Sequence, residues 1–373
     1  MFYMSRQVMR YSTRIIYVLV AILLSACTSS HKPVKELPPP VYPPPPDEPR
    51  FYYERTFRSS LDIKEFTAAD KFRWLVTGSV GSGGGLSKPY GIAVHQGRIY
   101  VSDTISRAVF MFDVPGREFK AIGTDGPGAL SKPIGVTVSH DGELYVCDNS
   151  GKRVVVYDKD GNYLRAIGGS EYFSRPSGVA TSPDGTKLYV IDTGGVDDNA
   201  HHQLTIWNAK TGAFIKAVGR RGVEPGEFNL ALQVATAPDG TVYVVDGGNF
   251  RVQAFTADGQ FLRKVGAVGV KTGQFSRPKG IAVDNEGNFY VIDTGFGNFQ
   301  IFNKEGQLLL FIGTRGNSGA PGEYMLPAGI AVDEDGRVYM VDQFFKKVDV
   351  FRPAHLQPNE GWLSTRNKPE KKK

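Results

Sequence analysis

The chain has 373 residues, of which 41% are hydrophobic and 12% aromatic, and this is enough apolar material for a large buried core. Its formal net charge of +6 lies mostly at the two ends, because residues 1–26 hold three arginines, residues 354–373 carry +3, residues 28–49 carry −1 and the remainder carries about +1. Nucleic-acid recognition requires a concentrated basic surface, so this balance argues against a nucleic-acid partner.

Residues 1–26 have the pattern of a secretory signal. Three arginines precede an apolar run at residues 15–24, which is too short for a comfortable membrane span. The sequence Leu24-Ser25-Ala26-Cys27 resembles a bacterial lipobox, and this implies cleavage before Cys27 and lipid attachment to its thiol. An uncleaved signal anchor is the alternative. Because Thr28 rather than an aspartate follows the cysteine, we expect an outer-membrane anchor in the cell envelope, with the protein facing the periplasm or the cell surface.

Residues 27–50 are rich in proline and are expected to form a linker. Runs of three and four prolines occur at 38–40 and 43–46. Such tracts favour polyproline II, which extends by about 3.1 Å per residue and acts as a semi-rigid spacer. The sequence therefore predicts that the following domain, residues 51–353, is held away from the membrane.

A repeated motif dominates residues 51–353. Tyr-(Val/Met)-x-Asp occurs six times, with aspartates 44 to 54 residues apart, at Asp103, Asp148, Asp192, Asp246, Asp293 and Asp342. Each copy follows a short apolar run, five times introduced by Pro-x-Gly, and a turn of the Asp-Gly or Asn-Gly type usually separates the two. A third and a fourth apolar run complete the unit. Four antiparallel strands per repeat of this length predict an all-β propeller, in which blades must stack on one another.

These motifs together resemble the NHL repeat, and the resemblance covers roughly residues 72–352. It implies a six-bladed propeller, a fold that serves as a protein- or RNA-binding platform, and related propellers act as metal-dependent lactonases, lyases and esterases. Residues 72–78 resemble a fourth strand, whereas the last repeat lacks one near Phe351. We therefore expect this amino-terminal segment to complete blade six and to close the ring. The fourth repeat departs from the pattern, because Ala231-Leu232-Gln233 stands where the other repeats have Pro-x-Gly.

The repeat aspartates occupy equivalent places in every blade, which favours a structural role over a ring of metal ligands. A carboxylate at a strand end can accept backbone N–H bonds from the next turn. A better metal candidate is the longer loop of the third repeat, which carries Asp197, Asp198, His201 and His202. Two carboxylates and two imidazoles within six residues could bind a divalent ion, although adjacent surface histidines are often only solvated. No other cofactor is predicted.

The resemblance to the NHL repeat implies polar residues after the aspartate, but blades four to six carry aromatic side chains there. They are Phe250, Phe296, Phe344 and Phe345. Loops that enter the blades add Arg221 and Arg315 on the same face, where they could clamp an acidic group. The alternatives are packing between loops for the aromatic residues and plain solvation for the arginines.

The sequence predicts a binding or scaffolding propeller more strongly than an enzyme. It contains no HExxH, no CxxC and no phosphate-cradling glycine loop. We expect a protein, peptide or glycan partner in the envelope. A metal-dependent hydrolase or lyase at the channel mouth is the alternative, and an accessory of periplasmic assembly or electron transfer is a third reading. Residues 354–373 are expected to be a basic, disordered tail.

Overall fold

The computed structural model describes residues 39–64, 84–195, 197–198 and 201–364. Within them the chain is almost entirely β-structure, with three single-turn 3-10 helices, η1 (Ser60–Asp62), η2 (Gly126–Gly128) and η3 (Gly247–Asn249). The strands form six antiparallel blades, so the predicted six-bladed all-β propeller with four strands per blade is confirmed.

The strands alternate regularly along the chain. Blades one and two consist of β3 (Pro89–His95), β4 (Arg98–Asp103), β5 (Ala108–Asp113), β6 (Glu118–Ile122), and β7 (Pro133–Val138), β8 (Leu144–Asp148), β9 (Arg153–Tyr157), β10 (Tyr163–Ile167). Blades three and four consist of β11 (Pro176–Thr181), β12 (Lys187–Asp192), β13 (Gln203–Asn208), β14 (Phe214–Val218), and β15 (Ala231–Thr236), β16 (Val242–Asp246), β17 (Arg251–Phe255), β18 (Phe261–Val265). Blade five consists of β19 (Pro278–Val283), β20 (Phe289–Asp293), β21 (Asn298–Phe302) and β22 (Leu308–Ile312). Blade six consists of β25 (Pro327–Val332), β26 (Val338–Asp342), β27 (Lys347–Pro353) and β2 (Phe51–Phe57), with β1 (Val41–Tyr42) beyond β2. The loop before blade six holds a short parallel pair, β23 (Thr314–Arg315) and β24 (Glu323–Tyr324).

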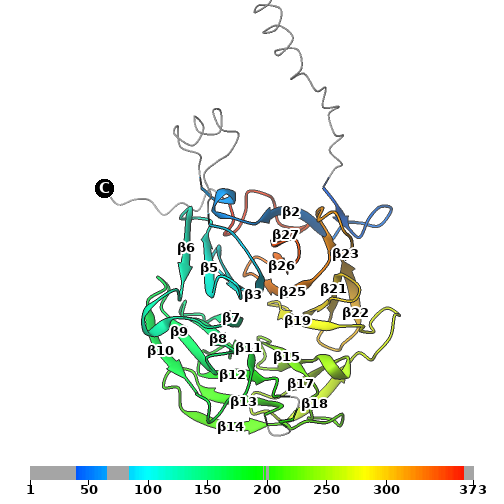
Figure 1. Cartoon of the computed structure of the whole chain (residues 1–373). Coiled ribbons are helices and arrows are strands. Elements are labelled where there is room, and N and C mark those ends of the chain that lie inside the picture. Colours follow the sequence, from blue (N-terminus) through cyan, green and yellow to red (C-terminus); the bar gives the residue numbers. More distant parts are fainter. Residues whose placement is uncertain (1–38, 65–83, 196, 199–200, 365–373) are drawn as a thin grey trace, which may run out of the picture. The chain divides into compact units, whose positions relative to one another are not determined.

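The first strand of each blade lies at the centre of the ring. β3, β7, β11, β15, β19 and β25 contact one another in this cyclic order (Figure 1). Their residues line a central channel of about 190 Å³. Glycine in the Pro-x-Gly motif permits this approach. A Cβ atom on Gly91 would lie 2.3 Å from the carbonyl oxygen of Ile134 in the next blade, so any side chain would push the two inner strands apart.

Neighbouring blades are held together by apolar clusters between their faces. Between blades one and two, Tyr100 and Met111 pack with Val136, Leu144 and Val146, and each of these side chains is at most 3% exposed. Burial of one such side chain contributes about 1.5–3 kcal/mol, and related clusters occur between other blades. Cys147 is also fully buried and forms no disulfide among the described residues, and burial raises the pKa of its thiol.

An amino-terminal strand closes the ring, as predicted, but the segment differs from the expected one. β2 pairs antiparallel with β27, from Phe51 opposite Pro353 to Phe57 opposite Val348. The expectation that residues 72–78 fill this position is therefore wrong; those residues lie outside the described part of the chain. Two long-range side-chain contacts hold β2 in place as the fourth strand of blade six. Thr56 donates to Asp349 at 2.6 Å, and Glu54 pairs with Arg337 at 2.8 Å.

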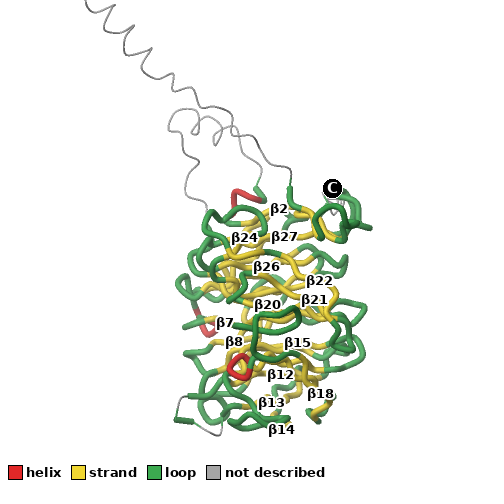
Figure 2. Tube along the Cα trace, turned by 90° about the vertical axis from the view of Figure 1, so that its right-hand side faces the viewer, coloured by secondary structure: helices red, strands yellow, loops and turns green. Residues whose placement is uncertain are grey.

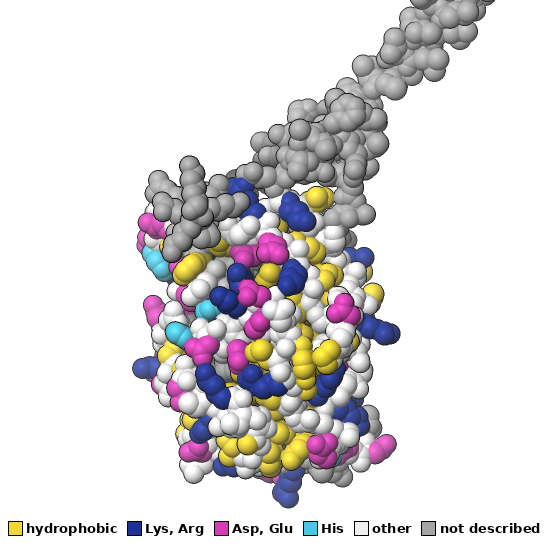
Figure 3. All heavy atoms as spheres, turned by 90° about the vertical axis from the view of Figure 1, so that its left-hand side faces the viewer, with side chains coloured by type: hydrophobic (Ala, Val, Ile, Leu, Met, Phe, Trp, Pro, Cys, Tyr) yellow, Lys and Arg dark blue, Asp and Glu magenta, His cyan; other side chains and the backbone are white. Residues whose placement is uncertain are grey.

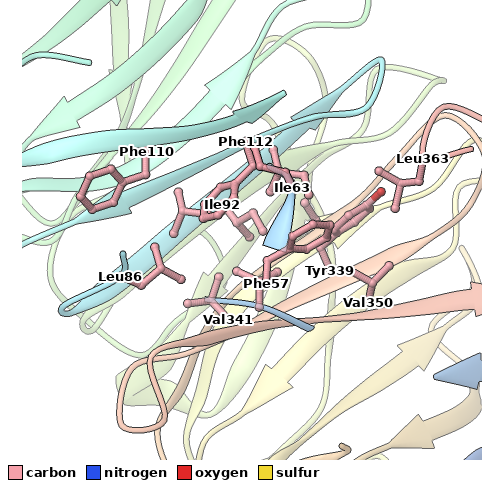
Figure 4. Close-up of a cluster of buried hydrophobic side chains, with 14 residues drawn as sticks. Phe57, Ile63, Leu86, Ile92, Phe110, Phe112, Tyr339, Val341, Val350 and Leu363 are labelled. Carbon is pink, nitrogen blue, oxygen red and sulfur yellow. The ribbon is translucent and has the colours of Figure 1, made fainter. Parts of the chain in front are cut away.

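The closure has its own buried core. Figure 4 shows Phe57 of β2 among side chains of blade one and blade six, with Ile63 and Leu86 from the connecting chain. Leu363, which follows the last strand, joins the same cluster and is 3% exposed. Both ends of the domain are thus pinned at the seam between the first and the last blade.

Parts of the expected linker and tail belong to the folded domain. Within the proline-rich tract, β1 extends the sheet of blade six, and the Tyr42 ring packs edge-on against Phe351 with centroids 5.7 Å apart. The expectation of an extended spacer therefore does not apply to residues 39–50. Nor does disorder apply to residues 354–364, because the Glu360 carbonyl oxygen accepts a hydrogen bond from buried Arg337 and Leu363 is buried.

The loops gather on two opposite faces of the ring (Figure 2). We call the end that holds the six repeat aspartates, and the loops that leave and enter the blades beside them, the repeat-aspartate face. Acidic and basic side chains are interspersed on the outer wall seen in Figure 3. Among the described residues no helix is long and apolar enough to cross a membrane. The expected signal segment and Cys27 lie outside the described residues.

Candidate functional site

The repeat aspartates tie together the loops of the repeat-aspartate face. In blade one, Asp103 accepts N–H bonds from Ser87 and Lys88 at 2.7 and 2.8 Å, and from Ile105 and Ser106 at 3.1 and 2.9 Å. Equivalent bonds run from Ser131, Lys132 and Gly151 to Asp148, from Ser174, Arg175 and Gly194 to Asp192, from Asn229 to Asp246, from Ser276, Arg277, Gly295 and Phe296 to Asp293, and from Met325, Leu326 and Phe345 to Asp342. The predicted hydrogen-bonding role of these carboxylates is confirmed.

Burial makes this arrangement dependent on its hydrogen bonds. All six aspartates are 0% exposed, and burial raises the pKa of Asp192 and Asp246 in spite of the backbone N–H donors around them. In blade four, where the repeat departs from its pattern, Asp246 also accepts from the guanidinium of buried Arg251 at 2.9 Å. The carboxylates are thus engaged within the protein, and they fix the loops on either side of them.

The loop of blade three does not gather its four candidate metal ligands. Asp198 pairs with His201 at 2.7 Å, whereas buried His202 meets the Gly195 carbonyl oxygen at 3.1 Å and Asp197 is exposed. Burial opposes ionisation of Asp198, but hydrogen bonds from His201 and Ser174 prevail and lower its pKa to about 2. Among the described residues no three His, Cys, Asp or Glu side chains are close enough to share a metal ion. Metal binding at this loop stays a prediction.

The four candidate phenylalanines lie on equivalent loops of blades four, five and six, but their surroundings differ. Phe344 is 56% exposed and stacks edge-on against half-buried Phe345, with centroids 5.1 Å apart. Phe250 is half-buried against the cluster between blades four and five. Phe296 lines a groove at the rim of blade five. Phe344 therefore offers the most accessible aromatic surface of the four.

The candidate arginines lie on the loops that enter blades four and six. Arg315 is exposed and donates to the Thr294 carbonyl oxygen at 3.3 Å. Arg221 is exposed and forms a backbone bridge with Phe228, while its neighbour Arg220 pairs with Glu227 at 2.7 Å. The structure places both candidates on the repeat-aspartate face, as expected from their position after strand four.

Exposed aliphatic residues extend the aromatic loops, and the sequence reasoning missed them. Val223, Val268 and Val270 are 66%, 64% and 85% exposed on the loops that enter blades four and five. Val270, Phe296 and exposed Phe311 line a groove of about 230 Å³ together with Asn298, whose buried side-chain oxygen has no hydrogen-bond partner among the described residues. These loops are longer than a tight turn, and their length was the feature of the sequence that could have indicated an exposed apolar surface. We call Val223, Val268, Val270, Phe296 and Phe344 the apolar sector.

The comparisons agree with this architecture. A sequence model of the NHL repeat matches residues 130–157 and 275–302, which fall in blades two and five. The chain therefore contains NHL repeats arranged as a six-bladed propeller. It is also 44% identical over 46 residues to the human E3 ubiquitin-protein ligase TRIM32. That match covers 12% of this chain and 7% of the length of TRIM32.

Solved propellers with several activities share the fold. A structural genomics protein of unknown function from Bacteroides thetaiotaomicron superposes with a TM-score of 0.57 and 18% identity, over 80% of this chain and 76% of its own. A gluconolactonase from Xanthomonas campestris gives 0.55 and 19%, over 72% and 86%. The virginiamycin B lyase from Staphylococcus aureus gives 0.51 and 15%, over 71% and 95%. At these identities the likeness concerns the fold alone.

Proposed function

We propose that this protein is an envelope-anchored binding module that captures a protein partner on the apolar sector of its repeat-aspartate face. The observation that carries the proposal is the set of exposed apolar side chains on the loops of blades four to six, above all Phe344 at 56% and Val270 at 85% exposure. Large apolar patches on soluble domains mark contact sites, and aromatic residues dominate the binding energy of such contacts. The NHL repeats and the local match to TRIM32 favour a protein as the partner.

The apolar sector is suited to this role because its loops are anchored. The backbone N–H of Phe345 donates to Asp342 at 2.8 Å, and those of Gly295 and Phe296 donate to Asp293 at 2.8 and 3.2 Å. A loop that is already ordered loses little conformational entropy when it binds. The face is therefore prepared for contact without rearrangement.

Partner capture by the full-length protein tests the contact surface. Phe344→Ala should remove most of the captured partner, because truncation of an exposed aromatic anchor typically costs about 2 kcal/mol or more of binding free energy. Ile215→Ala is the matched control, since Ile215 is 50% exposed on β14 of the outer wall. Equal capture by both variants and the unmodified protein would contradict the proposal.

The anchor is tested separately. Replacement of Cys27 by alanine should abolish incorporation of labelled palmitate and move the protein from the membrane fraction to the soluble fraction. Membrane association that persists in this variant would point instead to the uncleaved signal anchor. Partner capture by the purified protein should not depend on this substitution, because the propeller is intact.

A further inference from the structure

Basic residues recur at one position around the channel mouth. In four of the six blades the residue directly before the proline of the inner strand is a lysine or an arginine: Lys88, Lys132, Arg175 and Arg277. All four are exposed, and within the described part of the chain their side chains have no hydrogen bond or ion pair. Blades four and six carry Leu230 and Leu326 at the same position. The cations thus occupy blades five, one, two and three.

The repeat aspartates fix the backbone of these basic residues through hydrogen bonds. The backbone N–H of Lys88 donates to Asp103 at 2.8 Å, and that of Arg277 donates to Asp293 at 3.1 Å. Each carboxylate is therefore occupied by backbone donors, so that it positions the basic residue without pairing with its side chain. The result is a rim of fixed backbone positions whose positive charges face solvent.

Lys279 adds a fifth cation at the mouth itself. It follows the proline of β19, and its Nζ lies 4.5 Å from the centre of the Tyr90 ring. Tyr90 occupies the same position in β3 of blade one, and blade six lies between these two blades in the ring. The contact therefore spans the channel mouth. Within the described residues Lys279 has no ion pair or hydrogen bond from its side chain.

The charge of Lys279 is poorly compensated. The pKa of Lys279 is lowered to about 8, chiefly by burial and in addition by the charges of Arg277 and Lys88, and only Asp342 acts in the opposite direction. The Asp342 carboxylate is itself occupied by backbone N–H groups of Met325, Leu326 and Phe345. The half-buried amine of Lys279 thus lies within the electrostatic influence of two further cations, and the one carboxylate that counters them among the described residues already accepts backbone hydrogen bonds. An incoming anion would satisfy all three.

We propose that the channel mouth at Lys88, Arg277 and Lys279 binds an oxyanion, the carboxylate or phosphate group of an acidic ligand. Ammonium and guanidinium groups are the donors that such groups prefer, and their charge-assisted hydrogen bonds are about twice as strong as neutral ones. The Tyr90 ring supports Lys279 through a cation–π contact and leaves its N–H donors available. Lys132 and Arg175 extend the rim for a ligand with more than one acidic group. This site deepens the proposed function, on which it rests only in that the repeat-aspartate face is taken to be the binding face.

Calorimetric titration of the purified protein with inorganic pyrophosphate and with citrate, at low ionic strength and pH 7, tests the site. We expect saturable binding of at least one probe, weakened roughly tenfold or more by Lys279→Met and also weakened by Arg277→Gln. Binding of pyrophosphate alone would assign the site to phosphate groups, and binding of citrate alone to carboxylates; both results support it. The affinity should fall as the pH rises above about 8, because Lys279 loses its proton.

Lys159→Gln is the matched control, because it removes one exposed positive charge from a turn on the opposite face and leaves the same net charge as Arg277→Gln. Equal weakening by Lys159→Gln and Lys279→Met would reveal only nonspecific attraction and overturn the proposal, as would the absence of saturable binding to the unmodified protein. Thermal melting of each variant shows that it is folded. The probes need no protein partner, so failure of partner capture at Phe344 and failure of this site are separate outcomes.

Discussion

Phe57 of β2 packs against Phe112 of blade one with ring centroids 5.8 Å apart, and both side chains are fully buried. β2 is paired to the last blade by its backbone, so this ring contact links the end of the propeller to its beginning. The propeller is therefore closed by two kinds of interaction, backbone pairing of β2 with β27 and side-chain packing of Phe57 against blade one.

Phe57→Ala should lower the free energy of unfolding by about 3–5 kcal/mol, because it leaves a cavity at the seam of the ring. Urea denaturation measures the loss. Leu164→Ala on β10 serves as the control, since Leu164 is 44% exposed and its truncation should change stability by about 0.5 kcal/mol or less. If both variants unfold at the same urea concentration, β2 does not close the ring.

The long-range closure shows where sequence reasoning ends. The blade pattern was predictable because its signals are local, such as the turn residues and the alternation within Tyr-Val-x-Asp. The sequence of β2 has none of these signals, and its choice of partner depends on bonds such as that from Thr56 to Asp349, 293 residues away. Leu363 lies in a mostly polar tail that carries only a few scattered apolar residues, such as Leu356 and Trp362, so its burial could not be predicted from composition either.

Asp192→Ala should destabilise the protein by about 3 kcal/mol or more, because the backbone N–H groups of Ser174, Arg175 and Gly194 lose their acceptor. Asp192→Asn should cost less, since its side-chain oxygen can still accept one of these bonds. Melting temperatures of the two variants measure the difference.

The same carboxylate distinguishes a structural role from metal binding. Because Asp192 is occupied by backbone donors, treatment of the unmodified protein with a chelator should leave its melting temperature unchanged. A large fall after chelation, reversed by a divalent ion, would instead favour a metal ring and the hydrolase or lyase alternative.

Lys279→Met should stabilise the protein at pH 7. The pKa of Lys279 is about 8 in the folded state and about 10.5 in the unfolded state, so at pH 7 the folded state bears the cost of a poorly solvated charge. Between pH 8 and 10.5 the unfolded state binds more protons, and the stability of the unmodified protein rises with pH. Since Lys279 is only half-buried, we expect a gain of about 1–2 kcal/mol in the variant.

This gain should shrink as the pH is raised from 8 to 10.5, which denaturation at several pH values can follow. Lys159→Met, which removes an exposed lysine, should leave stability nearly unchanged at every pH. A Lys279→Met variant that is less stable at pH 7 would show that the lysine supports the fold, and its retention for ligand binding would lose its basis.

The basic rim illustrates a second limit of sequence reasoning. Lys88, Lys132, Arg175 and Arg277 recur in Ser-Lys-Pro or Ser-Arg-Pro, so the repeat itself was a usable signal. The net charge of the whole domain, about +1, gave no indication of this local cluster of positive charge. The contact between Lys279 and Tyr90 was beyond sequence reasoning, because it joins blades that meet only across the channel mouth.

Site-specific photo-crosslinking in living cells tests the central claim most directly. A photoreactive phenylalanine analogue would be placed at Phe344, on the apolar sector, or at Ile215, on the outer wall, in the otherwise unmodified full-length chain. The account predicts a discrete crosslinked product from position 344 and none of that size from position 215. Products from position 215 alone, or the same products from both positions, would contradict it.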